Sequence, residues 1–194
     1  VPAGRFQRDG TVTNISVIAQ PYRMSQYEIT RAQFEAIMGT DPSNITYSTG
    51  VSDPVQRVNW YQAIAFANKL SLNEGLTPVY AVSGITDWAT LTYASIPTSN
   101  NATWDAATAT WTSNGYRLPT EMEWIWAAMG APADGQGGDT NTTGYTKAFA
   151  GSTGSNVVGD YAVFGYYGLE TGRTTTARSN PVGSKIANEL GLYD

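Results

Sequence analysis

The sequence predicts an α+β fold that is irregular and rich in loops, on three observations. Three short amphipathic segments each begin with a helix-capping pattern and end near a glycine. Short runs of β-branched and aromatic residues are typical of brief strands. The intervening stretches are rich in Gly, Asn, Ser and Thr, and no repeat or clean linker divides the 194 residues. We expect a single domain, residues 1–194, with two to three short helices around small antiparallel sheets.

The first predicted helix begins at Thr30. Thr30 and Gln33 form a capping box, in which each side chain satisfies a backbone amide at the helix start. Gly39 is suited to end the helix in a left-handed conformation. One face carries the apolar residues Phe34, Ile37 and Met38.

The second predicted helix begins at Asn59, which has Gln62 three residues further on, and ends near Gly75. Its expected buried face consists of Trp60, Ala63, Ile64, Ala67 and Leu70.

The third predicted helix begins at Pro119-Thr120, with Glu123 completing the capping box, and stops at Gly130. Its expected apolar face carries Trp124, Ile125 and Ala128.

Two short strands are predicted at 79–82 and 89–93, paired as a hairpin around Ser83-Gly84. Residues 132–156 contain few apolar side chains and are expected to form a surface loop. Aromatic residues crowd together at 161–167, where core packing and a ligand groove are both open interpretations.

Composition excludes several classes of function. Charged residues make up 14% of the chain and the net charge is −5, with 11 Lys and Arg scattered along it. Because no basic stripe is present to neutralise phosphates, a nucleic-acid partner is not expected. No apolar run approaches the ~20 residues that a membrane-spanning helix needs. The absence of Cys and His excludes disulfides, thiolate nucleophiles, the usual zinc sites and Ser-His triads within these residues.

Five ordered motifs cover nearly the whole chain. They are VPAGRFQ at 1–7, MSQYEITRAQF at 24–34, PVQRVNW at 54–60 followed by GLTPVY at 75–80, GYRLPTEMEW at 115–124, and NPVGS at 180–184 with ANELGLYD at 187–194. Together they resemble the formylglycine-generating-enzyme, or sulfatase-modifying-factor, family, and the first of them resembles its opening strand. This resemblance implies a variant of the C-type-lectin fold.

The resemblance also implies an enzymatic chemistry, which these residues do not carry. Enzymes of the family oxidise a sulfatase cysteine to formylglycine with oxygen and a copper ion held by two cysteines. Those cysteines lie downstream of a motif inside which this sequence ends, at Asp194. We therefore identify no catalytic residue. We expect that residues 1–194 lack the C-terminal segment of the domain, and that the protein continues beyond Asp194.

The family's fold also includes non-enzymes, among them variable proteins of diversity-generating retroelements, which display a hypervariable C-terminal ligand site. Four runs resemble Treponema-type members, which include a variable surface lipoprotein. They are FQRDG at 6–10, GTDPS at 39–43, GSTGSN at 151–156 and GLETGR at 168–173.

Calcium is the one cofactor that the resemblance suggests for residues 1–194 themselves. Enzymes of the family bind it through asparagine, acidic and backbone oxygens after the third helix. Asn156, Val157 and Asp160 occupy a comparable stretch, and hard oxygen ligands suit calcium. Asn156 and Asp160 are the side-chain candidates, with loop capping as the alternative role.

Other constellations indicate structural roles. Arg117 is expected to pair with a buried carboxylate or with carbonyls. Glu121 and Glu123 are two apart on a helix, so they do not converge as a glycosidase pair would. Four sequences match the glycosylation pattern and are interpreted as coincidental, starting at Asn14, Asn44, Asn101 and Asn141.

The leading hypothesis is a non-enzymatic, exported binding protein, held at the cell surface by a lipid anchor outside this chain. It binds a protein or other surface ligand through a diversified surface C-terminal to Asp194. The alternative is a formylglycine-generating oxidase whose catalytic cysteines lie downstream. A third hypothesis, sulfoxide-synthase chemistry, needs an iron site built from histidines, and the chain has none.

Overall fold

A computed structural model describes residues 1–131, 140–164 and 178–193 of the chain. The chain forms two compact units, each assembled from separated segments. The first unit contains Val1–Glu28, Thr46–Pro54 and Pro119–Asp194, and the second contains Ile29–Ile45 and Val55–Leu118. The expectation of a single domain spanning 1–194 stays a prediction.

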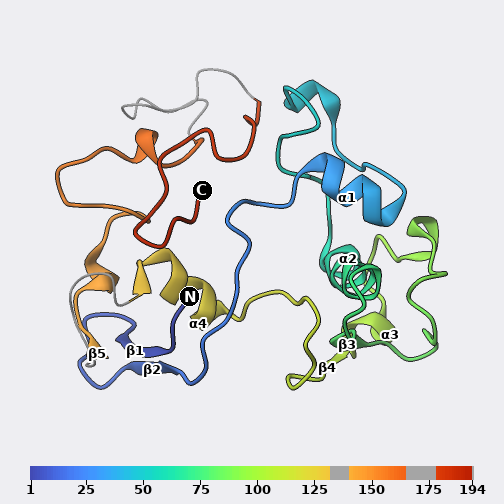
Figure 1. Cartoon of the computed structure of the whole chain (residues 1–194), viewed down its shortest axis with the longest axis horizontal. Coiled ribbons are helices and arrows are strands. Elements are labelled where there is room, and N and C mark those ends of the chain that lie inside the picture. The colour runs from blue at the N-terminus through green and yellow to red at the C-terminus, as the bar shows by residue number, and fades with distance from the viewer. Residues whose placement is uncertain (132–139, 165–177, 194) are drawn as a thin grey trace. The chain divides into compact units, whose positions relative to one another are not determined.

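The first unit is built on a small sheet with the strand order β2-β1-β5 (Figure 1). Strands β1 (Gly4–Gln7) and β2 (Ile15–Ile18) are antiparallel, whereas β5 (Thr140–Asn141) pairs with β1 in parallel. Helix α4 (Glu121–Ala128) supplies the centre of the core, because Trp126 stacks on Phe6 with ring centroids 5.4 Å apart. The predicted opening strand is confirmed, and β5 is a strand that the sequence analysis placed in a loop.

The second unit is mainly helical. It contains α1 (Arg31–Met38), α2 (Trp60–Asn73) and the one-turn α3 (Ala102–Asp105), together with the antiparallel pair β3 (Tyr80–Ala81) and β4 (Thr108–Ala109). Phe34 of α1 stacks on Phe66 of α2 at 5.3 Å in a core rich in aromatic residues. The described residues thus include four α-helices, of which α3 was not predicted from the sequence. The short 3-10 helices are Ile45–Tyr47, Tyr93–Ser95, Gly144–Thr146 and Val158–Asp160.

The predicted helix starts are confirmed in all three cases. Thr30, Asn59 and Thr120 each accept a hydrogen bond from the backbone amide three residues ahead, and the side chain there bonds back to the cap. Gly39 adopts the left-handed conformation that was expected after α1, with φ of 72°. Capping depends on neighbours within one turn, which explains why sequence alone locates it.

The predicted buried faces of two helices are partly wrong. On α4, Trp124 is 57% exposed and Trp126 is 1% exposed. The segment is apolar on nearly every side, so periodicity could not decide which tryptophan faces the core. On α2, the first helical residue Trp60 is 45% exposed, whereas the neighbouring Tyr61, which its ring contacts edge-on, is 8% exposed.

The predicted hairpin is wrong, although its first strand exists as β3. Strand β3 pairs with β4, and residues 89–92 form no strand. The Lys69 ammonium group explains the difference, because it donates to the carbonyl oxygens of Trp88, Ala89 and Leu91 at 3.1, 2.9 and 2.9 Å. Successive carbonyls in a strand point to opposite sides, so a backbone folded around one ammonium group cannot also pair as a strand.

No helix in the described part of the chain has the length and apolar character needed to cross a membrane.

Candidate functional site

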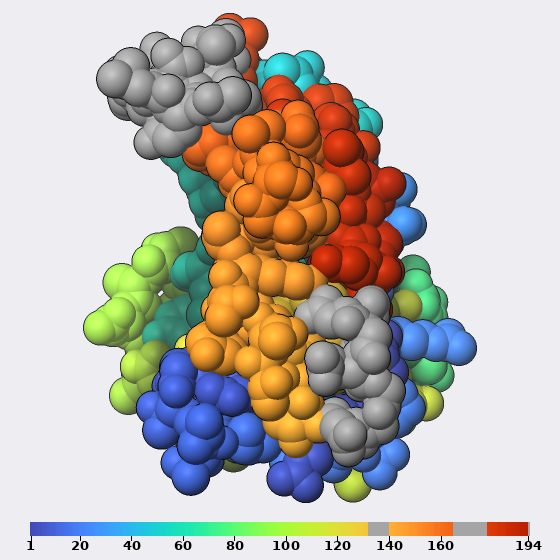
Figure 2. All heavy atoms as spheres, turned by 90° about the vertical axis from the view of Figure 1, so that its left-hand side faces the viewer, coloured from blue at the N-terminus to red at the C-terminus, as the bar shows by residue number. Residues whose placement is uncertain are grey.

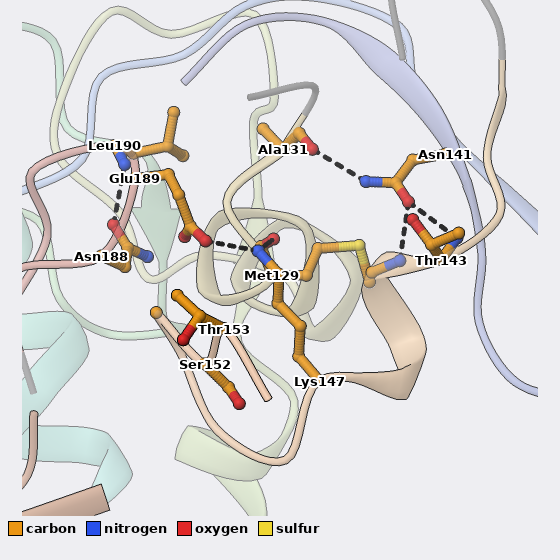
Figure 3. A network of polar contacts seen from close by, with 12 residues as sticks. Met129, Ala131, Asn141, Thr143, Lys147, Ser152, Thr153, Asn188, Glu189 and Leu190 are labelled. Carbon is orange, nitrogen blue, oxygen red and sulfur yellow. Dashed lines mark hydrogen bonds and ion pairs between the residues drawn. The ribbon is translucent and has the colours of Figure 1, made fainter. Parts of the chain in front are cut away.

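The end of α4 is a hub at which the side chains of three distant residues donate to backbone carbonyls. Figure 3 shows Asn141 and Lys147 beside their partners Ala131 and Met129. Asn188 Nδ2 donates to the Ala127 oxygen at 2.9 Å, Lys147 Nζ to the Met129 oxygen at 2.8 Å, and Asn141 Nδ2 to the Ala131 oxygen at 2.9 Å. Carbonyls at a helix end lack partners within the helix and must find them elsewhere. In this protein those partners come from segments 10, 18 and 61 residues away along the chain.

Asn188 also shapes the segment that contains it. Its Oδ1 accepts hydrogen bonds from the Leu190 and Leu192 amides at 2.9 and 3.2 Å, and its own amide donates to the Leu192 oxygen at 2.8 Å. The residue is 9% exposed. One buried amide therefore closes the turn 188–192 and fixes it to α4, which is a stable arrangement because both polar atoms of that side chain are bonded.

The end of the described chain is held at a second point. The Tyr193 amide donates to the Gln26 oxygen at 3.0 Å, and the Tyr193 ring lies 4.9 Å from that of Tyr27. The segment 188–193 is thus bonded both to α4 and to residues 26–27, which follow β2 in the chain.

An ion pair closes the same hub. Lys147 Nζ lies 2.6 Å from Glu189 Oε1, with the two side chains 15% and 30% exposed. Glu189 packs over Gly130, where a β-carbon would lie 2.6 Å from its Oε2 atom. Residues 140–164 and 178–193 lie side by side on the surface of this unit (Figure 2), and the Ile186 amide joins them by donating to the Asp160 oxygen at 2.8 Å.

The buried carboxylate of Asp53 anchors the start of residues 178–193. Asp53 is fully buried and accepts hydrogen bonds from Ser48 Oγ at 2.8 Å, the Thr49 amide at 2.6 Å, Thr49 Oγ1 at 2.7 Å and Ser179 Oγ at 3.0 Å. Burial acts to raise the pKa of this carboxyl, but the hydrogen bonds that it accepts outweigh burial and hold the pKa below its ordinary value of 3.8. Asp53 is therefore charged at neutral pH.

Of the two calcium candidates, Asn156 is engaged in hydrogen bonds within its own loop. Asn156 Oδ1 accepts from the Thr153 amide at 2.8 Å, and Asn156 Nδ2 donates to the Gly151 oxygen at 2.9 Å. Asp160 is exposed at the end of the 3-10 helix Val158–Asp160. In the described ranges no group of three acidic side chains lies close enough to hold a metal ion. Loop capping by Asn156 is what the geometry shows, and calcium binding at Asn156 and Asp160 stays a prediction.

The other residues singled out from the sequence have structural contacts. Arg117 Nη1 donates to the Leu118 oxygen at 3.1 Å, and its guanidinium lies 5.1 Å from the centre of the Trp111 ring. Glu123 caps α4. Asn141 is 1% exposed and bonded within the hub, so the glycosylation pattern that begins there is coincidental in the folded protein. Of the aromatic cluster, Tyr161 packs on Phe149 at 5.6 Å, while residues 165–167 lie outside the described residues.

Comparison with protein families decides the classification. The model of the sulfatase-modifying factor enzyme 1-like domain matches residues 1–194. The chain belongs to this family. Its α+β architecture, with small sheets, short helices and long loops, is the fold that the sequence motifs predicted for a member.

Two solved structures and one curated protein are similar to the chain over its whole length. The chain is 34% identical to Treponema denticola variable protein 1, with a TM-score of 0.69, over 100% of this chain and 66% of that one. It is 31% identical to the chaperone protein LppX of Paenibacillus barcinonensis, over 100% of this chain and 66% of that protein's length. The chain thus spans just under two thirds of the curated relative that it matches. A crystal structure of CarF, 24% identical with a TM-score of 0.65 over 74% of its length, shares the fold.

The hub at the end of α4 was missed by sequence reasoning. Asn188 and Glu189 lie within the motif ANELGLYD at 187–194, but no role was predicted for them. Lys147 and Asn141 lie in the stretch interpreted as surface loop. No local pattern could have identified them, because each acts on a carbonyl that the fold brings near and not on a sequence neighbour.

Proposed function

We propose that this protein is a non-enzymatic ligand-binding scaffold of the family, which displays a diversified binding surface on polypeptide C-terminal to Asp194. Similarity over the whole chain to a protein named as a variable protein supports the proposal. The observation that carries it is the attachment of the segment 188–193 to α4 through Asn188.

Variable display requires a backbone that does not depend on the side chains that vary. The hub meets this requirement, because Asn188, Lys147 and Asn141 all bond to backbone carbonyls of 127–131. Such bonds survive substitution of the residue that supplies the carbonyl. Polypeptide that follows Asp194 would therefore start from a fixed point whatever its sequence, which suits a scaffold with function placed on its loops.

The ligand is proposed to be a protein at the cell surface. Similarity to a relative named as a chaperone favours a protein partner over a small molecule. Export and a lipid anchor outside residues 1–194 complete the proposal. Digestion of the protein by protease added to intact cells, together with incorporation of labelled fatty acid, would support this localisation, and full protection from protease would contradict it.

Sequencing many copies of the gene tests variable display directly. We expect differences to concentrate at scattered positions after Asp194, while codons 141, 147 and 188 stay constant. Uniform sequences in every copy, or differences spread evenly over residues 1–194, would contradict the proposal.

The second candidate is a formylglycine-generating oxidase, which the family match favours. It requires two cysteines a few residues apart after Asp194. Incubating the full protein with copper, oxygen and a sulfatase-motif peptide, followed by mass spectrometry, distinguishes the two. Conversion of the peptide cysteine to an aldehyde would establish the oxidase and overturn the non-enzymatic proposal.

A further inference from the structure

A cavity of about 350 Å³ lies beside the segment that ends the described chain. One wall is formed by Arg23, Met24 and Gln26, the other by the turn 190–192, and Val1 completes the lining. Its volume falls at the small end of the range for ligand pockets, about 300–1,000 Å³. It suits a small ligand of roughly a dozen non-hydrogen atoms.

Both walls are held in place before any ligand arrives. The Tyr193 amide bonds to the Gln26 oxygen at 3.0 Å, which joins the two walls directly. Asn188 fixes the amides of Leu190 and Leu192, and Leu190 also packs against the core that contains Trp126. A cavity with fixed walls binds without a large ordering cost.

The lining combines an apolar surface with the guanidinium group of Arg23. Met24, Leu190 and Leu192 supply aliphatic surface, and all three are half-buried. Within the described ranges the Arg23 guanidinium has no ion pair or hydrogen bond. The Gln26 side chain adds amide groups on the same wall. A guanidinium offers two parallel donors that match a carboxylate, whereas the aliphatic surface favours a hydrocarbon group beside it.

From this geometry we infer that the cavity binds a carboxylate carried on a short branched aliphatic group. The Arg23 guanidinium holds the carboxylate, and Met24, Leu190 and Leu192 cover the hydrocarbon. A free small acid and the C-terminal leucine of a peptide share this chemistry. The site belongs to the scaffold, so the inference goes beyond variable display and does not depend on it.

N-acetyl-L-leucine is the probe, titrated into the full protein by isothermal calorimetry or by NMR. We expect saturable binding, with N-acetyl-L-leucinamide at least about tenfold weaker because it lacks the charge that Arg23 pairs with. Acetate is expected to bind more weakly as well, since it lacks the hydrocarbon group.

Matched variants tie the binding to the cavity. Arg23→Gln should weaken the binding of N-acetyl-L-leucine by about tenfold. Arg23→Lys should weaken binding less, because lysine keeps the positive charge but lacks the two parallel donors of the guanidinium group. Arg8→Gln removes the same charge from an exposed position outside the cavity and should leave binding unchanged. Both arginines are exposed, so neither change is expected to unfold the protein.

A peptide ending in leucine, compared with its C-terminal amide, distinguishes the sources. Tighter binding of the peptide acid than of N-acetyl-L-leucine assigns the site to peptide C-termini, and weaker binding assigns it to free acids. The inference is overturned if no saturation occurs up to about 10 mM, or if acid and amide bind equally. It is equally overturned if Arg23→Gln behaves as Arg8→Gln. These results would leave the gene-sequencing test of variable display untouched.

Discussion

Asn188 donates a hydrogen bond to the carbonyl oxygen of Ala127, 61 residues earlier in the chain, at 2.9 Å. This contact joins the last described segment to the end of α4. It gives a buried side-chain amide its partner, at a carbonyl that also accepts from the Gly130 amide at 3.1 Å. Loss of the Asn188 side chain would leave the amides of Leu190 and Leu192 without the oxygen to which they donate.

We expect Asn188→Ala to destabilise the protein by about 3 kcal/mol, because three hydrogen bonds of a buried amide are lost together. Urea denaturation followed by circular dichroism measures it. The control is Asn100→Ala, at an exposed position, where a change within about 0.5 kcal/mol is expected. Equal effects of the two substitutions would refute the role of Asn188.

Asp53 makes part of the stability dependent on pH. Its pKa is lowered in the folded protein, so its contribution is fully present above the ordinary value of 3.8 and is lost as pH falls through the folded value. Asp53→Asn should cost about 2 kcal/mol at pH 7, where the charged carboxylate accepts four hydrogen bonds. The difference in unfolding free energy between the two proteins should shrink towards pH 3. A difference that stays constant over this range would count against the assignment.

Two glycines with left-handed backbones separate backbone strain from steric overlap. Gly39 and Gly130 have φ of 72° and 86°, but a β-carbon at Gly39 meets open space and one at Gly130 meets Glu189. Gly39→Ala should cost about 1–2 kcal/mol through strain alone. Gly130→Ala should cost up to about 1 kcal/mol more, measured by thermal unfolding, because the Glu189 carboxylate must shift while it is paired with Lys147. The hub geometry is wrong if the two variants are equally stable.

The two tryptophans of α4 test which face of the helix is buried. Trp126→Ala should destabilise the protein by about 3–5 kcal/mol, since it empties the centre of the core beside Phe6. Trp124→Ala should cost about 1 kcal/mol or less, because the side chain is 57% exposed. Denaturation curves of the two variants settle the comparison, and the reverse order would restore the face predicted from the sequence.

Lys69 should control the loop 88–91. Lys69→Met keeps the aliphatic stem but removes the ammonium group that donates to three carbonyls. We expect faster amide hydrogen exchange in residues 88–93 and little change in α4, which belongs to the first unit. Lys69→Arg is expected to be intermediate, because a planar guanidinium cannot converge on three oxygens as an ammonium can. Exchange that is unchanged in Lys69→Met would show that the loop holds its shape without the lysine.

The sequence by itself determined the family, the fold class and the beginnings of three helices. A capping box such as Thr30 with Gln33 closes within a single turn, so all of its physics is present in four neighbouring residues. The motifs identified the fold for the same reason, since each is a short ordered string that needs no contact to be recognised.

Only the tertiary structure decided which surfaces are buried and which distant groups meet. Trp124 and Trp126 are equivalent as apolar residues on an apolar helix. Trp126 is the buried one because it stacks on Phe6 in the core. Residues 89–92 have strand-like composition, yet their carbonyls accept hydrogen bonds from the Lys69 ammonium group instead. Asn188 finds Ala127 because folding brings them together, and no pattern of residues within one segment encodes a bond between two segments.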